Sequence, residues 1–147
     1  MQATQDRLSS AEPAGQITAT EIVGGHWMKA LPEDISLALM IQLEMTVYRW
    51  MAQLNPGYRG GTWTLLKLSN GGLHLRPVDV ERVRIVVETN GFEGEVSADA
   101  AGIIVTLFGL NHLCHSGYVK QFHDLYYGLR DYALAHAEAR LILQAID

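Results

Sequence analysis

The sequence predicts an α+β fold, in which about three to four α-helices pack on a small antiparallel β-meander. Residues 32–54 and 118–132 carry apolar side chains at helical spacing. Short segments between them alternate apolar and polar side chains, which is typical of strands with one buried face. The dipeptide Asn70-Gly71 lies between two of these segments and is well suited to a tight hairpin turn. Helices packed on an antiparallel sheet satisfy all three observations.

The length and composition fit one domain. The chain has 147 residues, of which 48% are hydrophobic, enough for a core without disulfides or metal ions. Residues 1–16 have almost no large apolar side chains, so we expect a flexible tail followed by a single domain over residues 17–147. The lone Cys114 favours a reducing compartment. No signal peptide or run of about 18 apolar residues occurs, which predicts a cytoplasmic protein without a membrane span.

The first helix is predicted over residues 32–54 as a central packing element. Its apolar residues cover most of its circumference, and they include Met40, Leu43, Val47, Met51 and Leu54. The turn-forming residues at positions 55–57 end it.

The hairpin follows, and a two-residue turn at Asn70-Gly71 would fix its register by pairing Ser69 with Gly72. One face would then carry Leu66, Leu68, Leu73 and Leu75, and the other would carry Leu65, Lys67, His74 and Arg76. Residues 82–88 also alternate, which predicts a third strand of the same sheet.

A second helix is predicted from about Ala98 to His115, after a short strand over residues 94–97. Ser97 is suited to cap its N-terminus, and Asp99 suits the positive end of the helix dipole. Small residues at positions 98–102 would let another backbone approach closely. An amphipathic stripe over residues 118–132 and a shorter pattern over 141–146 complete the helices.

The most metal-like feature is the segment His112-Leu113-Cys114-His115. Its histidines would share one helical face while Cys114 points elsewhere, and no second ligand pair completes a tetrahedron. We therefore expect no metal and no cofactor.

A cluster of three acidic residues is the main candidate for catalysis. Glu93, Glu95 and Asp99 lie close in the sequence, and paired carboxylates can serve as acid and base. No nucleophile or phosphate-binding motif accompanies them, so we predict that the chain is not an enzyme. A small hydrolase that uses Glu95 or Asp99 with a histidine is the alternative.

A basic surface is the second alternative. In the predicted register Lys67, His74, Arg76 and Arg84 could share one sheet face beside Trp63, as a nucleic-acid-binding module would require. The 11 basic and 16 acidic residues give a net charge of −5, which argues against direct nucleic-acid binding. The same charge is too small for good imitation of DNA.

Specific segments resemble the ArdB/KlcA family of antirestriction proteins. They comprise Tyr58, Gly60, Gly61 and Trp63; Leu68, Ser69, Gly71, Gly72 and Pro77; Asn90, Gly91, Phe92, Gly94 and Glu95; Ser97 through Gly102; and Tyr126, Leu129, Arg130, Ala133, His136, Glu138, Ala139 and residues 145–147. The resemblance spans most of the chain from about Ile17 onward. His74 and Arg76 depart from it, since they replace what is often an aromatic and an apolar residue.

The resemblance implies a bacterial inhibitor of type I restriction endonucleases that protects incoming unmethylated DNA. Its implied partner is a type I restriction-modification complex or one state of it. We expect contact through exposed loops and through the mixed sheet face, which is the face predicted to carry Lys67, His74 and Arg76. Exposed polar loop residues bind more often than they pack. The predicted partner-binding residues are Trp63, Lys67, Asn70, His74, Arg76, Glu93, Glu95 and Asp99.

Overall fold

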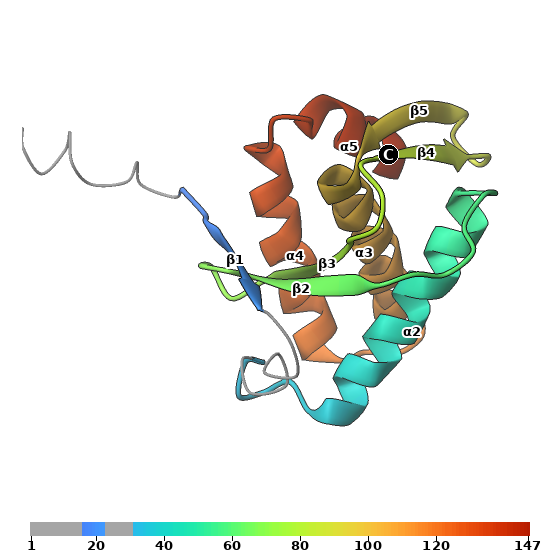
Figure 1. Cartoon of the computed structure of the whole chain (residues 1–147). Helices are drawn as coiled ribbons and strands as arrows, with labels where there is room; N and C mark the ends of the chain where they lie inside the picture. Colours follow the sequence, from blue (N-terminus) through green and yellow to red (C-terminus); the bar gives the residue numbers. More distant parts are fainter. Residues whose placement is uncertain (1–15, 23–30) are drawn as a thin grey trace, which may run out of the picture.

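The computed structural model describes residues 16–22 and 31–147. In chain order its elements are β1 (Ala19–Ile22), α2 (Leu37–Leu54), β2 (Trp63–Leu68), β3 (Leu73–Pro77), β4 (Arg82–Val87), β5 (Phe92–Ser97), α3 (Ala98–His115), α4 (Lys120–Leu134) and α5 (Ala139–Ile146). Figure 1 shows how they are arranged. Helices packed with antiparallel strands confirm the predicted α+β class. Almost all of the predicted tail lies outside the described residues.

The strands form two antiparallel sheets, not a single meander. In the first sheet β2 lies between β1 and β3, and in the second β4 pairs with β5. The prediction that residues 82–88 add a strand to the hairpin sheet is therefore wrong. Alternation identifies a strand but not its partner, and β4 pairs with the strand that follows it across the turn at Gly91. The third strand of the first sheet is β1, which the sequence pattern did not reveal.

The hairpin at Asn70-Gly71 is present, but its register differs by one residue from the prediction. Leu68 donates its N–H to the carbonyl of Gly72, so residues 69–71 form the loop. Within that loop Gly71 has a φ of 91°, as in hairpins where a left-handed residue follows a tight turn. Leu66 then lies opposite His74, and Thr64 lies opposite Arg76.

This register separates the residues of the predicted mixed face, because a shift of one residue on one strand changes which side chains share a face. Residues opposite each other in antiparallel strands lie on the same face. Lys67 is therefore on the face of Leu65 and Leu73, away from His74 and Arg76. The prediction that Lys67 shares the mixed face with His74 and Arg76 is therefore wrong.

Helix α3 is the centre of the fold, a position that the sequence had suggested for the first helix. Every residue from Ala100 to Leu107 is buried, and α3 contacts the other three described helices and strands β3, β4 and β5. Its predicted start at Ala98 and its cap at Ser97 are confirmed, since the Ser97 hydroxyl accepts the N–H of Ala100 at 3.1 Å.

The small residues at the start of α3 let its backbone lie against strand β3. A Cβ atom added to Gly102 would lie 2.1 Å from the carbonyl oxygen of Leu75. One turn later the buried Thr106 hydroxyl accepts the N–H of Leu75 at 3.2 Å. Helix α3 thus covers β3 closely and satisfies one of its backbone donors.

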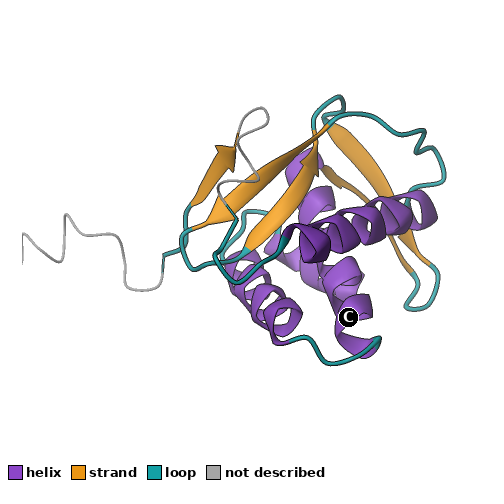
Figure 2. Ribbon diagram, turned by 90° about the horizontal axis from the view of Figure 1, so that it is seen from below, coloured by secondary structure: helices purple, strands orange, loops and turns teal. Residues whose placement is uncertain are grey.

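The other helices surround α3, and Figure 2 shows the three-stranded sheet as one layer with the helices in an adjacent layer. Helix α2 begins at Leu37, later than predicted, because Ser36 caps it by accepting the N–H of Leu39 at 3.2 Å. Residues before Ser36 form a turn closed by a bond from Ile35 to the carbonyl of Pro32. Helices α4 and α5 match the two C-terminal amphipathic patterns.

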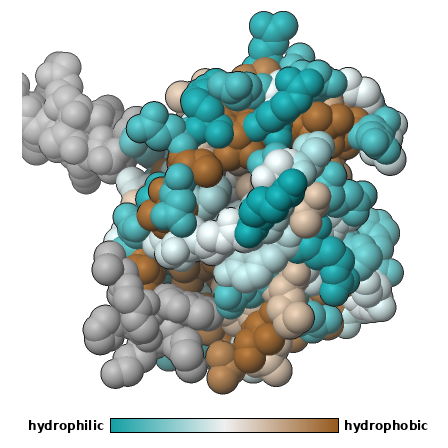
Figure 3. Space-filling model, turned by 45° about the vertical axis from the view of Figure 1, so that its right-hand side comes forward, coloured by the Kyte–Doolittle hydropathy of each residue, from teal (hydrophilic) through white to brown (hydrophobic). Residues whose placement is uncertain are grey.

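The surface of α2 keeps a stripe of exposed apolar side chains, which are Leu37, Ile41 and Met45. Hydrophobic side chains also appear among hydrophilic ones on the face turned forward in Figure 3. Within the described ranges, no helix combines the length and apolar character that a membrane span requires.

Candidate functional site

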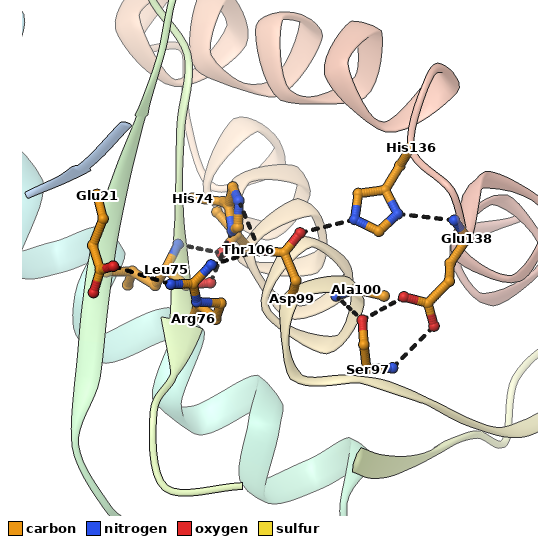
Figure 4. Close-up of polar contacts among 10 residues, drawn as sticks. All are labelled: Glu21, His74, Leu75, Arg76, Ser97, Asp99, Ala100, Thr106, His136 and Glu138. Atoms are coloured by element: carbon orange, nitrogen blue, oxygen red, sulfur yellow. Dashed lines mark hydrogen bonds and ion pairs between the residues drawn. The ribbon is translucent and has the colours of Figure 1, made fainter. Parts of the chain in front are cut away.

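Asp99, in the first turn of α3, is the centre of a polar network (Figure 4). Its Oδ2 lies 2.8 Å from Nε2 of His136, and its Oδ1 accepts a bond from Nη1 of Arg76 at 3.2 Å. Nε2 of His74 lies 3.8 Å from the same Oδ1. Three of the eight predicted site residues, His74, Arg76 and Asp99, are therefore brought together, with His136 as an addition.

Strand β3 supplies two of these side chains, and they lie on the same face because alternate residues of a strand do so. His74 and Arg76 both point to the side where α3 and α4 lie. Arg76 is held a second time, since its Nη2 donates to Oε2 of Glu21 on β1 at 3.4 Å. Arg76 therefore links the edge strand of the sheet to the start of α3.

His136 lies in the turn between α4 and α5, and its tautomer follows from its bonds. Its Nδ1 accepts the backbone N–H of Glu138 at 2.9 Å, so in the neutral ring the proton is on Nε2. That N–H points at Asp99 and donates to it. The turn after α4 is thereby tied to the first turn of α3.

His74 is the one fully buried ring of the network, with 0% of its surface exposed. Its Nδ1 donates to the carbonyl of Leu75 at 3.1 Å, and its ring stacks on Tyr132 of α4 at 6.0 Å between centroids. Its Nε2 has no hydrogen-bond partner. Burial lowers the pKa of His74 to about 4, despite the opposing influence of Asp99, so the ring is neutral at pH 7.

Asp99 remains ionised over a wide pH range. Burial alone would raise its pKa, but the hydrogen bond from His136, the proximity of His74 and the bond from Arg76 together lower it to about 2. A carboxylate with so low a pKa is a poor general base near neutral pH. Glu95 lies on β5, where it pairs with Arg82. The network therefore does not provide the acid and base pair of the hydrolase alternative.

A second contact, between Ser97 and Glu138, joins the same turn to the start of α3. The backbone N–H of Ser97 donates to Oε1 of Glu138 at 2.9 Å, and the Ser97 hydroxyl donates to Oε2. These bonds lower the pKa of Glu138 against the opposing effect of its burial. Ser97 thus caps α3 and binds Glu138 with one hydroxyl.

We expect Ser97→Ala to destabilise the protein by about 1–3 kcal/mol, because it removes a helix cap and one bond to a partly buried carboxylate. Urea denaturation followed by circular dichroism measures this loss. Ser36→Ala is the matched control, since Ser36 caps α2 without a second partner among the contacts described. An equal loss in the two variants would show that the bond to Glu138 contributes nothing.

The remaining predicted residues lie elsewhere. Asn70 has a structural role in the hairpin loop: its amide donates to the carbonyl of Gly128 on α4 at 2.9 Å and accepts the N–H of Gly72 at 3.0 Å. Trp63 packs against Tyr48 and Tyr58. Lys67 is exposed on the opposite sheet face from His74. The eight residues therefore do not form one surface.

Glu93 and Glu95 lie on β5, each beside an arginine of β4. Arg84 donates to Glu93, and Nε of Arg82 donates to Oε1 of Glu95 at 3.4 Å. All four side chains are more than half exposed. They form the charged outer face of β4–β5, while Val83, Ile85, Val87 and Val96 of the same hairpin are buried.

The segment His112-Leu113-Cys114-His115 does not have the geometry of a metal site. Cys114 is a free thiol, and burial raises its pKa, so it is a poor thiolate ligand. His115 bonds through Nδ1 to the carbonyl of Asn111 at 2.8 Å. Among the residues placed by the structure, no group of three or more His, Cys, Asp or Glu side chains is arranged to hold a metal ion.

Comparison with known proteins gives a family match. A sequence model of the family described as "Antirestriction protein" matches residues 56–147. That range includes Ser97, Asp99, His136 and Glu138, and thus most of the network.

Whole-chain relatives agree with that match. The chain is 42% identical over 146 residues to antirestriction protein KlcA of Escherichia coli, covering 95% of this chain and 100% of that protein. It is 33% identical over 148 residues to protein YafX of Escherichia coli K12, covering 98% and 97%.

A solved structure extends the agreement to the fold. It is described as showing that KlcA and ArdB proteins have a novel fold and antirestriction activity against type I DNA restriction systems in vivo but not in vitro. It superposes with a TM-score of 0.81 at 38% identity, covering 92% of this chain and 96% of that one.

Proposed function

The chain belongs to the antirestriction protein family of the KlcA/ArdB type, and from this premise we propose that it inhibits type I restriction endonucleases by binding a protein of the restriction complex. It protects incoming unmethylated DNA without catalysis and without imitating DNA. The family assignment carries the first part of the proposal. The ion pairs formed by acidic side chains of the fold support the part that concerns DNA imitation.

The supporting observation is that acidic side chains around the network and on the second sheet are already paired. An arginine or histidine nitrogen lies within 4 Å of Glu21, Glu93, Glu95, Asp99 and Glu138. A DNA mimic needs unneutralised carboxylates, because the phosphates that it replaces attract basic protein surfaces by their charge. Internal pairing and a net charge of only −5 favour ordinary protein recognition.

The outer face of β4–β5 is the surface that we propose for this contact. Exposed ion pairs contribute about 0–1 kcal/mol to stability, so these four charged side chains are not needed for folding. Positive and negative groups that alternate on a surface can set the orientation and identity of a partner. The proposed contact residues are Arg82, Arg84, Glu93 and Glu95.

The first test is to plate unmodified phage on bacteria with or without a type I restriction system, each with or without this protein. We expect the protein to raise plating efficiency only on the restricting host. Equal plating with and without the protein on that host would contradict the proposal. A second experiment measures inhibition of the purified restriction complex, because the related KlcA and ArdB activity is described in vivo but not in vitro. We expect relief in cells to exceed inhibition of purified endonuclease if the protein binds a state of the complex that is present in cells and absent from the purified assay.

A charge swap tests the proposed surface. Arg84→Glu combined with Glu93→Arg preserves the pair but reverses the charges presented to a partner. We expect relief of restriction to fall at least about tenfold, since like charges across an interface cost several kcal/mol, while the melting temperature stays that of the wild type.

The matched control is Lys120→Asp combined with Asp124→Lys, which reverses another exposed pair, at the start of α4. This control should relieve restriction like the wild type. If both swaps act alike, or the first leaves relief unchanged, the outer face of β4–β5 is not the contact surface.

A further inference from the structure

A pocket beside Trp63 has no part in the network or in the proposed contact. Its volume is about 230 Å³, and it lies between α2 and the three-stranded sheet, next to the end of β1. Its walls include Glu44 and Tyr48 of α2, Trp63 and Thr64 of β2, and Ile22 of β1. Pockets for drug-sized ligands are about 300–1,000 Å³, so this one suits a single side chain.

Glu44 gives the pocket a negative charge that no basic side chain of the described residues neutralises. Its Oε1 accepts a hydrogen bond from the Tyr48 hydroxyl at 2.6 Å. Burial and this bond raise the pKa of Tyr48, so the phenol keeps its proton and remains the donor in this bond. Within residues 16–22 and 31–147, no Arg, Lys or His nitrogen lies within 4 Å of Glu44. This distinguishes Glu44 from the paired acids of the network.

Two aromatic rings stand beside this carboxylate. The centroids of Tyr48 and Trp63 are 5.2 Å apart, with 49° between the ring planes. The indole N–H of Trp63 donates to the Tyr58 hydroxyl at 3.0 Å, which fixes the orientation of the ring. Aromatic faces attract cations, and the attraction grows when the cation leaves water. A carboxylate with two such rings is complementary to a cation on an apolar stem.

We propose that this pocket binds the cationic end of an arginine or lysine side chain from a protein partner. A groove of about 390 Å³ along β1 supports a polypeptide ligand, since it shares Ile22 with the pocket and continues past Thr20 to Lys67. Strand β1 is the edge of its sheet in the described part of the chain. A partner chain in the groove could place a basic side chain at Glu44 and an acidic one at Lys67. This inference does not depend on the proposed antirestriction function.

The test is a titration of the full-length ¹⁵N-labelled protein with Nα-acetyl-arginine N-methylamide. The neutral probe Nα-acetyl-citrulline N-methylamide has nearly the same shape. We expect a saturable shift of the Trp63 indole N–H resonance with the arginine probe alone. Glu44→Gln should weaken binding about fivefold or more, and it should fold normally because the amide oxygen can still accept the Tyr48 hydroxyl.

Glu88→Gln is the matched control, since it removes one negative charge at an exposed position beyond the end of β4. It should bind the arginine probe like the wild type. Equal weakening in both variants would show a general effect of net charge and would overturn the proposal. An equal response to citrulline, unchanged binding by Glu44→Gln, or no saturable shift would also overturn it.

Discussion

Replacing Gly102 with alanine is expected to destabilise the protein by about 3 kcal/mol or more. The added methyl group would lie 2.1 Å from the carbonyl oxygen of Leu75 and 2.9 Å from the Cα of Arg76. Both are backbone atoms of β3, so no side-chain rotation can relieve the contact. Overpacking a core costs about 1–3 kcal/mol and sometimes more, and here helix α3 must move away from the strand. The same movement would break the bond from Leu75 to Thr106.

Helix propensity acts in the opposite direction, since alanine is favoured over glycine by about 1 kcal/mol in a helix. Gly109→Ala on the same helix separates the two effects. There the nearest atom to an added Cβ is a methyl group of Val47 at 3.2 Å, which can shift slightly, and we expect a change within about 1 kcal/mol. Urea denaturation of both variants measures the difference. A Gly102→Ala protein as stable as the wild type would show that α3 is not held against β3 as described.

The contact at Gly102 also shows which features the sequence could predict. The cap at Ser97, the limits of α3 and the small residues at positions 98–102 can be recognised from neighbours in the chain, and all three were predicted. The register of the β2–β3 hairpin was not, because Asn-Gly suits loops of different lengths and a difference of one residue exchanges the sheet faces. The existence of β1 depends on its pairing with the distant β2. The partner of β4 is the strand that follows it, and it was missed because alternation identifies a strand but not its partner.

The network around Asp99 was foreseen only in part, for a related reason. His74, Arg76 and Asp99 were predicted as site residues, but the argument for the first two used a shared face with Lys67 that does not exist. His136 lies 37 positions from Asp99, and Glu138 lies 41 positions from Ser97. Neither belongs to a motif that specifies such a contact. The resemblance to the family singled out both positions without indicating what they touch.

His74 is expected to make folding sensitive to mild acid, by about 3 kcal/mol between pH 7 and pH 4. The unfolded chain takes up a proton on this histidine near pH 6.5, whereas burial lowers the pKa in the folded protein to about 4. The unfolded state therefore binds more protons in this interval, and stability falls as the pH falls through it. The difference of about 2.5 pKa units corresponds to the stated energy at 1.36 kcal/mol per unit.

Other charged and aromatic groups lie close to His74, and those that titrate could also change stability with pH. They are Asp99 on α3, Arg76 on the same strand, His136 after α4 and the ring of Tyr132. The pKa of Asp99 is lowered to about 2, so its contribution to stability is present above about pH 4 and is lost only below it. The interval from pH 4 to 6.5 thus reports on His74 with little interference from Asp99.

The variant that tests this effect is His74→Phe, which keeps an aromatic ring beside Tyr132 but cannot take up a proton. Urea denaturation at several pH values from 4 to 7 should show that the wild type loses about 3 kcal/mol more than the variant over this range. His115→Phe changes an exposed histidine of α3 and should follow the wild-type curve. Parallel curves for the wild type and His74→Phe would contradict this prediction, because they would mean that His74 has the same pKa in the folded and the unfolded protein. A wild type that gains stability relative to the variant as the pH falls would mean that His74 is charged in the folded protein and forms a buried ion pair with Asp99, which lies 3.8 Å from its Nε2.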